Sequence, residues 1–261
     1  MLSQHHDDHL DAARDAGDRA RKAGVEIREL HDLPGAHAMI DLLAEIWGRP
    51  LITVEFLRAL TRAGNYAAGA YDGDRLVGVC LGFHEEPAAR TLHSHVAGVV
   101  PGLAGRGVGA ALKLHQRAWA LARGIPTIEW TFDPLVSRNA YFNIVKLGAL
   151  PVEYLPNFYG AMHDAINGAD DTDRLLMRWD LLSPRVAAAC SGAPFDRPAA
   201  GPAGRRVAVP DDIEALRADD PAAAVAWRRR LRDELAPLMT SGGRVVDFDR
   251  DLGYLVDLET P

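Results

Sequence analysis

The stretch that decides the fold reads Val99-Val100-Pro101-Gly102-Leu103-Ala104-Gly105-Arg106-Gly107-Val108-Gly109-Ala110. Its alternating glycines, 105, 107 and 109, permit positive φ angles and remove side-chain bulk. Apolar residues then recur with a helical period over 111–122, so the loop opens directly into a helix. The first N–H groups of a helix have no partner within it and attract phosphates. The stretch therefore predicts a diphosphate site, with Arg106 as a cation at its rim and Lys113 and Arg117 further along the helix.

The segments around this loop alternate between strand-like and helical patterns. Before it, we expect strands at 25–30, 66–71, 76–84 and 91–100 and helices at 36–47 and 54–63. After the helix that ends near Gly124, we expect a strand at 127–132, a helix at 136–147 and strands at 149–155 and 174–182. Only one parallel crossover interrupts an antiparallel order. The pattern predicts an α+β fold with a mixed, mostly antiparallel sheet and helices on both faces.

The chain is expected to have four parts. Residues 1–24 form a charged tail or helix, and residues 25–186 form the main domain. Residues 187–204 are dense in Ala, Gly and Pro and read as a linker. Residues 205–261 form a small α/β appendage packed on the main domain, with a strand at 206–209, a helix at 221–239 and strands at 244–249 and 253–258.

Composition excludes several classes of protein. The chain has 261 residues, of which 48% are hydrophobic and 25% charged, as in ordinary globular proteins. A net charge of -7 argues against a general nucleic-acid binder. The polar N-terminus is no signal peptide and no apolar run could span a bilayer, so a cytoplasmic protein without membrane contact is expected. The two cysteines are too few for a disulfide framework or a metal cluster, and Cys80 reads as a buried thiol. His5, His6 and His9 read as part of a solvated tail, so no metal is expected.

A dinucleotide is the competing ligand for the glycine loop. The pattern Gly105-x-Gly107-x-x-Ala110 fits the loose dinucleotide fingerprint, and Glu129 lies at a suitable distance for a ribose contact. However, a doubly wound sheet needs several parallel crossovers, and the run His93-Ser94-His95 is polar for a central parallel strand. This alternative would make the protein an NAD(P)-dependent oxidoreductase.

The glycine loop and several segments after it resemble the GNAT superfamily of acyl-CoA-dependent N-acyltransferases. The family's phosphate loop, Arg/Gln-x-x-Gly-x-Gly/Ala, corresponds here to residues 104–109, with Ala104 in the Arg/Gln position. Further segments are similar to a poorly characterised branch of predicted acetyltransferases: 131–143, 152–160, 173–179, 226–228 and 245–248. Together they cover most of the chain from residue 25 onward.

The resemblance implies how acetyl-CoA or another acyl-CoA would bind, as a co-substrate. The strand before the loop and strand 127–132 would splay apart, and the pantetheine arm would bond to the backbone of Val99 and Val100. The diphosphate would lie on Gly105, Arg106, Gly107, Val108, Gly109 and Ala110. Asn139 and Asn143, one turn apart on the next helix, would reach the pantetheine, with helix capping and surface polarity as the alternative explanation.

The catalytic groups are inferred from the same resemblance. Many members use a tyrosine on the helix after the second splayed strand as general acid, and that place falls here on Ile144. Other members use a base on the strand before the loop, which falls near His93, with His95 on the same face. Histidine titrates near neutrality and suits this role, although a pair of hydrogen-bonding histidines is the alternative. Tyr141, Tyr154 or Tyr159 would replace the missing acid, with Tyr159 preferred.

The acceptor is expected to be an amine of a small molecule. Asn157 suggests a site-lining loop, and Arg174 would bind an acceptor carboxylate or form a salt bridge at a strand start. An amino acid acceptor and a succinyl donor in place of acetyl are therefore open alternatives. Ala104 and Ile144 also leave open a non-catalytic acyl-CoA sensor. The appendage would either cover the acceptor pocket or form a subunit contact, and the second case would give a homodimer.

Overall fold

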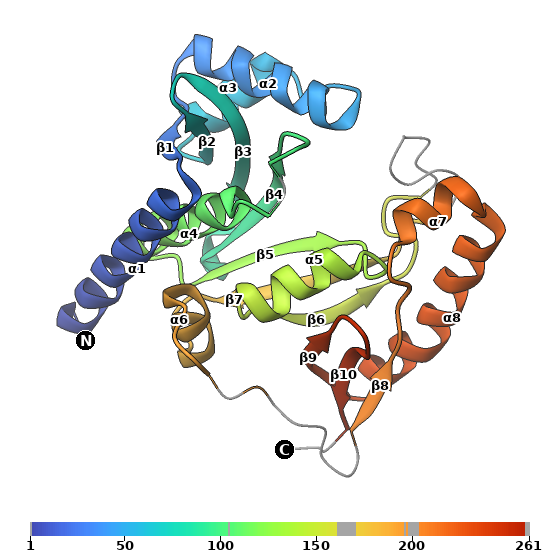
Figure 1. Cartoon of the computed structure of the whole chain (residues 1–261). Coiled ribbons are helices and arrows are strands. Elements are labelled where there is room, and N and C mark those ends of the chain that lie inside the picture. Colours follow the sequence, from blue (N-terminus) through green and yellow to red (C-terminus); the bar gives the residue numbers. More distant parts are fainter. Residues whose placement is uncertain (1, 104, 161–170, 196, 198–203, 259–261) are drawn as a thin grey trace. The chain divides into compact units, whose positions relative to one another are not determined.

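The structure is a computed structural model that describes residues 2–103, 105–160, 171–195, 197 and 204–258, with its elements labelled in Figure 1. The chain divides into two compact units. The first comprises Met1–Glu129 and Asp180–Ser191, and the second comprises Trp130–Trp179 and Gly192–Pro261. The seven-stranded sheet has the order β1-β2-β3-β4-β5-β7-β6, and the division falls within β5 (Thr127–Phe132).

The first unit contains an antiparallel sheet of four strands that continues into the beginning of β5. The four are β1 (Glu26–Glu29), β2 (Tyr66–Asp72), β3 (Arg75–His84) and β4 (Thr91–Val99). Its helices are α1 (Leu2–Ala23), α2 (Leu33–Trp47), α3 (Val54–Arg62), η1 (Pro87–Ala89), α4 (Val108–Ala122) and α6 (Pro184–Ser191). The β4–β5 pair is the one parallel pair among the described strand pairs, so the predicted mixed, mostly antiparallel sheet is confirmed.

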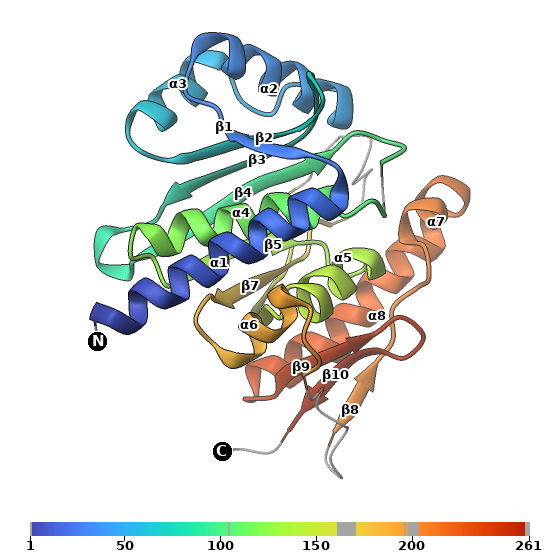
Figure 2. The ribbon, with the colours of Figure 1, turned by 60° about the vertical axis from the view of Figure 1, so that its left-hand side comes forward.

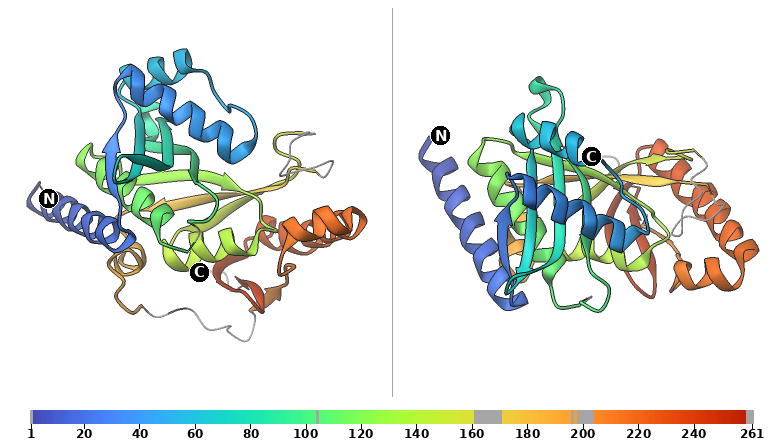
Figure 3. Two further views of the ribbon diagram at one scale, coloured as in Figure 1. Left: turned by 45° about the horizontal axis from the view of Figure 1, so that its top comes forward. Right: turned by 90° about the horizontal axis from the view of Figure 1, so that it is seen from above.

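Helices cover both faces of this sheet, as the sequence predicted. A Cβ atom added to Gly98 would lie 2.2 Å from the Trp47 ring of α2, whereas one added to Gly78 would lie 3.1 Å from Leu112 of α4. Gly78 pairs with Val99, and neighbouring residues of a strand point to opposite faces. α2 and α4 therefore lie on opposite sides, and Figure 3 shows α2 running across the strands. Only glycine at position 98 allows Trp47 to approach so closely.

The N-terminal segment is a helix with one buried face, so of the two expected forms, tail or helix, it has the second. α1 lies along α4, as Figure 2 shows, and buries Ala12, Ala16 and Ala23. Asp15 forms an ion pair with the Arg117 side chain of α4, at 3.6 Å. Small alanine side chains allow the two helix backbones to come close, which the charged composition of this segment concealed.

The second unit combines the remaining sheet strands with the appendage. Its elements are the end of β5, α5 (Ser137–Tyr141), η2 (Phe142–Lys146), β6 (Leu150–Leu155), β7 (Arg174–Asp180), β8 (Arg205–Val207), α7 (Ile213–Asp219), α8 (Pro221–Thr240), β9 (Arg244–Asp249) and β10 (Gly253–Asp257). Strands β8, β10 and β9 form a separate antiparallel sheet. The helix expected at 136–147 is in fact an α-helical turn followed by the π-helical η2.

Two described α-helices were not expected from the sequence. α6 occupies the start of the expected linker, where three consecutive alanines favour a helix. α7 begins at the N-cap Asp212, whose carboxylate accepts the N–H groups of Glu214 and Ala215. Among the residues that the structure describes, no helix has the length and apolar character that crossing a membrane requires. The expected division of the chain at residues 24, 186 and 204 stays a prediction.

Candidate functional site

Two of the three alternating glycines in the loop have the positive φ angles that the sequence predicted. Gly105 and Gly107 have φ angles of 86° and 89°, and Gly107 is the N-cap of α4 without any side-chain cap. Gly109 instead lies in the first turn of the helix, and a Cβ atom there would be 3.9 Å from Val99. The N–H groups of Gly109 and Ala110 have no acceptor among the described residues, so they remain available to an anion.

The cations expected beside the loop are arranged differently from the prediction. The Arg106 guanidinium binds the Asp72 carboxylate at 3.1 Å and lies 3.4 Å from the Ala23 carbonyl oxygen. Lys113 and Arg117 are buried within the first unit and do not line the loop: Lys113 donates to Ser94, and Arg117 donates to the Leu181 carbonyl. Ala104, the departure from the family pattern, lies outside the described residues. The groups that this loop can offer to an anion are therefore mainly its backbone N–H groups.

Pairing between β4 and β5 is short. It covers three pairs and ends at His93–Glu129, although β4 continues to Val99. The Val100 N–H donates to the Val77 carbonyl, so Val100 faces β3, and its carbonyl accepts the Leu103 N–H. In an antiparallel ladder, neighbouring residues direct their N–H and C=O groups to opposite sides. Val99 therefore directs its backbone groups away from β3, whereas those of Val100 already have partners.

β4 has a β-bulge against β3 at the two candidate histidines, close to the point where its ladder with β5 ends. Gly82 pairs with Ser94 and Leu81 pairs with Val96, so His95 is the extra residue of the bulge. The ring of Phe83 stacks on His93 at 5.0 Å and lies 5.7 Å from His95. The two imidazoles are 6.2 Å apart. The predicted pair thus forms a compact aromatic cluster on one face of β4.

Carboxylates flank His93 on both sides. The Glu85 carboxylate lies 3.9 Å from its Nδ1 atom, and the buried Glu129 is its partner across the ladder. Burial lowers the pKa of His93 below its ordinary value, and the His95 charge lowers it further, against the opposite effect of Glu129. Burial also lowers the pKa of His95. Both imidazoles are therefore neutral near pH 7 and can accept a proton.

Glu85 and Glu129 could not be predicted in this role from the residue pattern, because the folding of the strands brings them to His93. It did contain a signal for Lys113, which interrupts the apolar face of α4. Lys113 donates to Ser94 at 2.9 Å and to Gln116 at 2.8 Å. Burial lowers its pKa to about 8. Ser94 lies between the two histidines in sequence, so this network fixes the opposite face of the same strand segment.

In the second unit, Tyr159 and Arg174 lie together. Tyr159 is half exposed, and its hydroxyl lies 3.0 Å from the Thr131 hydroxyl. The guanidinium of Arg174 is 5.3 Å from the Tyr159 ring and donates to the Asp173 carbonyl. The Asp173 carboxylate itself binds Arg232 and accepts the Tyr154 hydroxyl. Burial lowers the pKa of Arg174.

The three candidate asparagines of the second unit differ in accessibility. Asn139 is exposed on α5, whereas Asn143 is buried in the π-helical η2. Asn157 has a φ angle of 44°, and its side-chain oxygen accepts the Thr172 N–H. Its side-chain oxygen is thus used by Thr172. Ile144, at the place of the usual acid, is completely buried.

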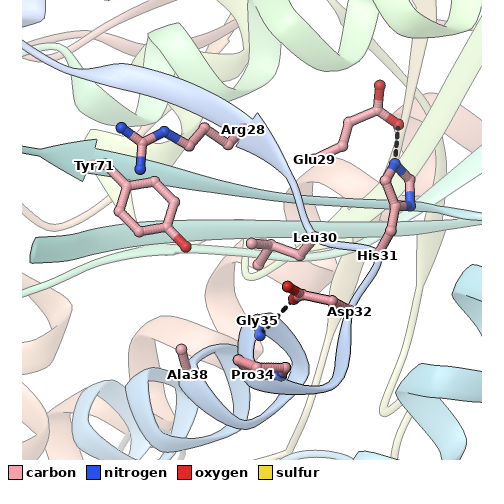
Figure 4. A pocket seen from close by; sticks show the side chains of 9 residues that line it. All are labelled: Arg28, Glu29, Leu30, His31, Asp32, Pro34, Gly35, Ala38 and Tyr71. Carbon is pink, nitrogen blue, oxygen red and sulfur yellow. Dashed lines mark hydrogen bonds and ion pairs between the residues drawn. The ribbon is translucent and has the colours of Figure 1, made fainter. Parts of the chain in front are cut away.

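A separate groove of about 450 Å³ lies at the edge of the first unit (Figure 4). It is lined by residues of β1, β2 and the start of α2. The Arg28 guanidinium lies over the Tyr71 ring at 4.6 Å, and Asp32 caps α2 by accepting the Gly35 N–H. The groove shares no residue with the glycine loop or the histidine cluster, so it is not part of the candidate site.

Comparisons with known proteins come from structure alone, since no family model and no curated protein matches the chain. The ribosomal-protein-S18-alanine N-acetyltransferase from Escherichia coli is 13% identical, with a TM-score of 0.50 over 60% of this chain and 94% of its own. An N-acetyltransferase from Staphylococcus aureus Mu50 is 17% identical, with a TM-score of 0.50 over 60% and 98%. Ard1 from Thermoplasma volcanium is 17% identical, with a TM-score of 0.50 over 61% and 99%. At these identities the likeness concerns the fold.

Proposed function

The chain has the fold of the GNAT N-acetyltransferases, and from that fold we propose that it transfers an acyl group from acyl-coenzyme A to an amine of a small molecule. The observation that supports this best is the relation between the glycine loop and β4. The β4–β5 ladder ends at His93, and β4 then leads past the outward-directed backbone of Val99 into the loop. Residues 93–110 thus contain a candidate base, a strand edge that an extended ligand could join, and N–H groups that an anion could bind.

In this proposal the diphosphate binds the N–H groups of Gly109 and Ala110, with Gly105, Arg106, Gly107 and Val108 completing the loop. Arg106 would share its charge between Asp72 and the phosphate. The pantetheine amides bond to the Val99 backbone, as strand edges bind extended ligands. Asn139 and Asn143 are proposed as further contacts of the pantetheine, as the resemblance implied.

The chemical step is proposed to be direct attack without a covalent enzyme intermediate. His93 or His95 accepts a proton from the acceptor ammonium, and the amine lone pair then forms the C–N bond as the C–S bond breaks. The departing coenzyme A thiolate takes a proton from Tyr159 or from water, and the newly acylated nitrogen gives its surplus proton to the resulting tyrosinate or hydroxide, which leaves a neutral amide. Glu85 and Glu129 stabilise the imidazolium that forms at His93, because they lie beside it.

Arg174 and Asn157 are proposed to hold the acceptor, and an amino acid is the favoured class because a guanidinium matches a carboxylate. The test measures coenzyme A release with acetyl-CoA and succinyl-CoA against amino acids, polyamines and amino sugars. We expect turnover with at least one amine. Binding of coenzyme A without turnover would instead indicate a sensor, and binding of NAD(P) alone would contradict the proposal.

A further inference from the structure

The β-bulge of β4 changes the face of the sheet to which Ser94 points. Gly98 faces α2, because a Cβ atom there would meet the Trp47 ring. Ser94 lies four residues earlier, so in a regular strand it would also face α2. Its hydroxyl instead accepts a hydrogen bond from Lys113 of α4, on the opposite side of the sheet. The extra residue His95 causes this reversal, because one inserted residue moves the side chains on its far side to the other face.

The same reversal decides where His93 points. His93 and Ser94 are neighbours and point to opposite faces, so His93 lies on the α2 face, where the ring of Phe83 stacks on it. Pairing of β3 with β4 without the bulge would turn the His93 ring toward α4 and the Ser94 hydroxyl toward α2. The position of the candidate base therefore depends on the register that brings Ser94 to Lys113.

Lys113 and Gln116 of α4 form a buried network against this bulge. Lys113 Nζ donates to Ser94 Oγ at 2.9 Å and to Gln116 Oε1 at 2.8 Å, and all three side chains are buried. A Cβ atom added to Gly82, the partner of Ser94, would lie 3.0 Å from Gln116 Nε2 and 2.9 Å from the His93 carbonyl oxygen. Glycine at position 82 thus allows the Gln116 side chain to lie close to the strand pair at the bulge.

The network favours the bulged register because it needs the Ser94 hydroxyl. A buried ammonium that loses a hydrogen-bond partner is destabilising, since no water replaces the lost bond. A slip to regular pairing would remove the hydroxyl from Lys113 and place His95 opposite Gly82, with its ring toward α4. That ring is larger than the Ser94 side chain and would enter the space that Gln116 occupies. The slipped register is therefore disfavoured by both charge and packing.

The charge of Lys113 also acts on His93. Four charged or titratable groups surround the imidazole: His95 on β4, Glu85 after β3, Glu129 on β5 and Lys113 on α4. Burial lowers the pKa of Lys113 to about 8 and raises that of the Cys80 thiol, which faces it from β3. At neutral pH the ammonium is therefore charged and the thiol neutral, and the ammonium lowers the pKa of His93.

We propose that Lys113, itself held by Gln116, is a positioning residue for the base: through Ser94 it holds the bulge that presents His93 and His95 on the α2 face of β4. This inference rests on the proposed function, in which these histidines accept the proton. The effect is on the chemical step, so it should appear in kcat, with the affinity for coenzyme A largely kept.

The experiment uses the full chain and measures kcat, the Kd for coenzyme A by calorimetry, backbone hydrogen exchange of residues 93–96, and the titration of the His93 imidazole by NMR. Lys113→Met removes both hydrogen bonds and the charge, whereas Ser94→Ala removes only the hydroxyl. We expect kcat to fall about tenfold in each variant, with Kd within about twofold of the wild type. Exchange of 93–96 should become faster.

The pH readout separates this role from general destabilisation. Lys113 is charged in the wild type over the pH range in which His93 titrates, so Lys113→Met removes a positive charge near the imidazole. The pKa of His93 should therefore rise in this variant, and the acid limb of kcat/KM should move to higher pH with it.

Two further variants serve as controls. Ser94→Thr keeps the hydroxyl and should retain most of the wild-type kcat. Tyr66→Phe removes a buried hydroxyl that lies 3.0 Å from His115 Nδ1 on the same helix, so it should lower stability and leave kcat unchanged. The inference is overturned if Lys113→Met and Ser94→Ala keep the wild-type kcat. It is equally overturned if Ser94→Thr or Tyr66→Phe lowers kcat as much as Ser94→Ala does.

Failure of the proposed function would be distinguishable from failure of this inference. A wild-type chain that acylates none of the amines would overturn the proposed function. Hydrogen exchange of 93–96 and the His93 titration would then decide the inference, and wild-type values of both in Lys113→Met would overturn it. If Lys113→Met does not fold, hydrogen exchange and kcat of Ser94→Ala, compared with Ser94→Thr, decide the question.

Discussion

His93 of β4 and Glu129 of β5 form the last pair of the parallel ladder in the first unit. Beyond this pair, β4 continues for six residues and leads into the glycine loop. A histidine with a lowered pKa, a neighbouring carboxylate and a strand edge thus meet at one point of the sheet. Groups of this kind are expected where a proton is transferred.

Replacing both histidines tests their catalytic role. We expect His93→Gln with His95→Gln to lower kcat at least tenfold, because no other described imidazole lies in the Phe83 cluster to accept the proton. The coenzyme A affinity should change little, since the imidazoles do not belong to the loop. Steady-state kinetics and calorimetry measure the two effects. His84→Gln, an exposed histidine of the same sheet, serves as the control. Unchanged turnover in the double variant would remove the pair from the mechanism.

The pH profile follows from the direction of the pKa shifts. Burial lowers the pKa of His93 and His95 below 6.5, so the neutral base predominates at pH 7. kcat/KM should therefore be level near neutrality and should fall as the pH decreases through the lowered pKa. The Glu129 charge raises the pKa of His93, so Glu129→Gln should move this acid limb to lower pH. An acid limb that moves to higher pH in Glu129→Gln would contradict the assignment of His93.

The sequence predicted most elements of the fold because their signals are local. The strand at 127–132 and the start and end of the loop helix agree with β5 and α4, since glycine and apolar periodicity mark them directly. The burial of α1 was missed because its alanines give little hydrophobic signal. The π-helical turn at η2 was also missed, since its longer hydrogen-bond spacing leaves no mark in the residue pattern.

The candidate site was predictable only in part for a similar reason. The glycine loop and His93 could be found from neighbouring residues, but the partners of Arg106 and of Lys113 are distant in the chain. Asp72 reaches Arg106 through the β2–β3 hairpin, and Ser94 reaches Lys113 across 19 positions. A single sequence contains no signal for such pairs.

The conformation of Gly107 provides a test of the phosphate loop. Gly107→Ala places a side chain at a φ of 89°, which costs about 1 kcal/mol or more in a left-handed backbone. The N-cap should relax, the first N–H groups of α4 should turn, and Kd for coenzyme A should rise at least tenfold. Calorimetry measures the affinity.

Gly73→Ala is the matched control, because Gly73 has a φ of 61° in the β2–β3 turn and open space around it. It should lower the stability by a similar amount and leave the affinity unchanged. Equal losses of coenzyme A affinity in both variants would show that the effect is general destabilisation.

Lys113 gives a prediction on stability. Burial lowers its pKa from 10.5 to about 8, so the folded chain releases this proton more easily than the unfolded chain does. Between pH 8 and 10.5 the unfolded state therefore binds more protons, and the free energy of unfolding rises with pH, by an amount on the order of 3 kcal/mol from this group. Below pH 8 the buried charge remains and this gain is lost.

Lys113→Met should remove that contribution, because a thioether side chain of similar length does not titrate. Urea unfolding at pH 7.5 and pH 10 measures the free energy of unfolding of both proteins, and the difference between the two pH values should be larger for the wild type. Lys146→Met, at an exposed lysine, should behave like the wild type. A Lys113→Met chain with the wild-type pH dependence would mean that Lys113 exchanges its proton in water, and that its bonds to Ser94 and Gln116 open in solution.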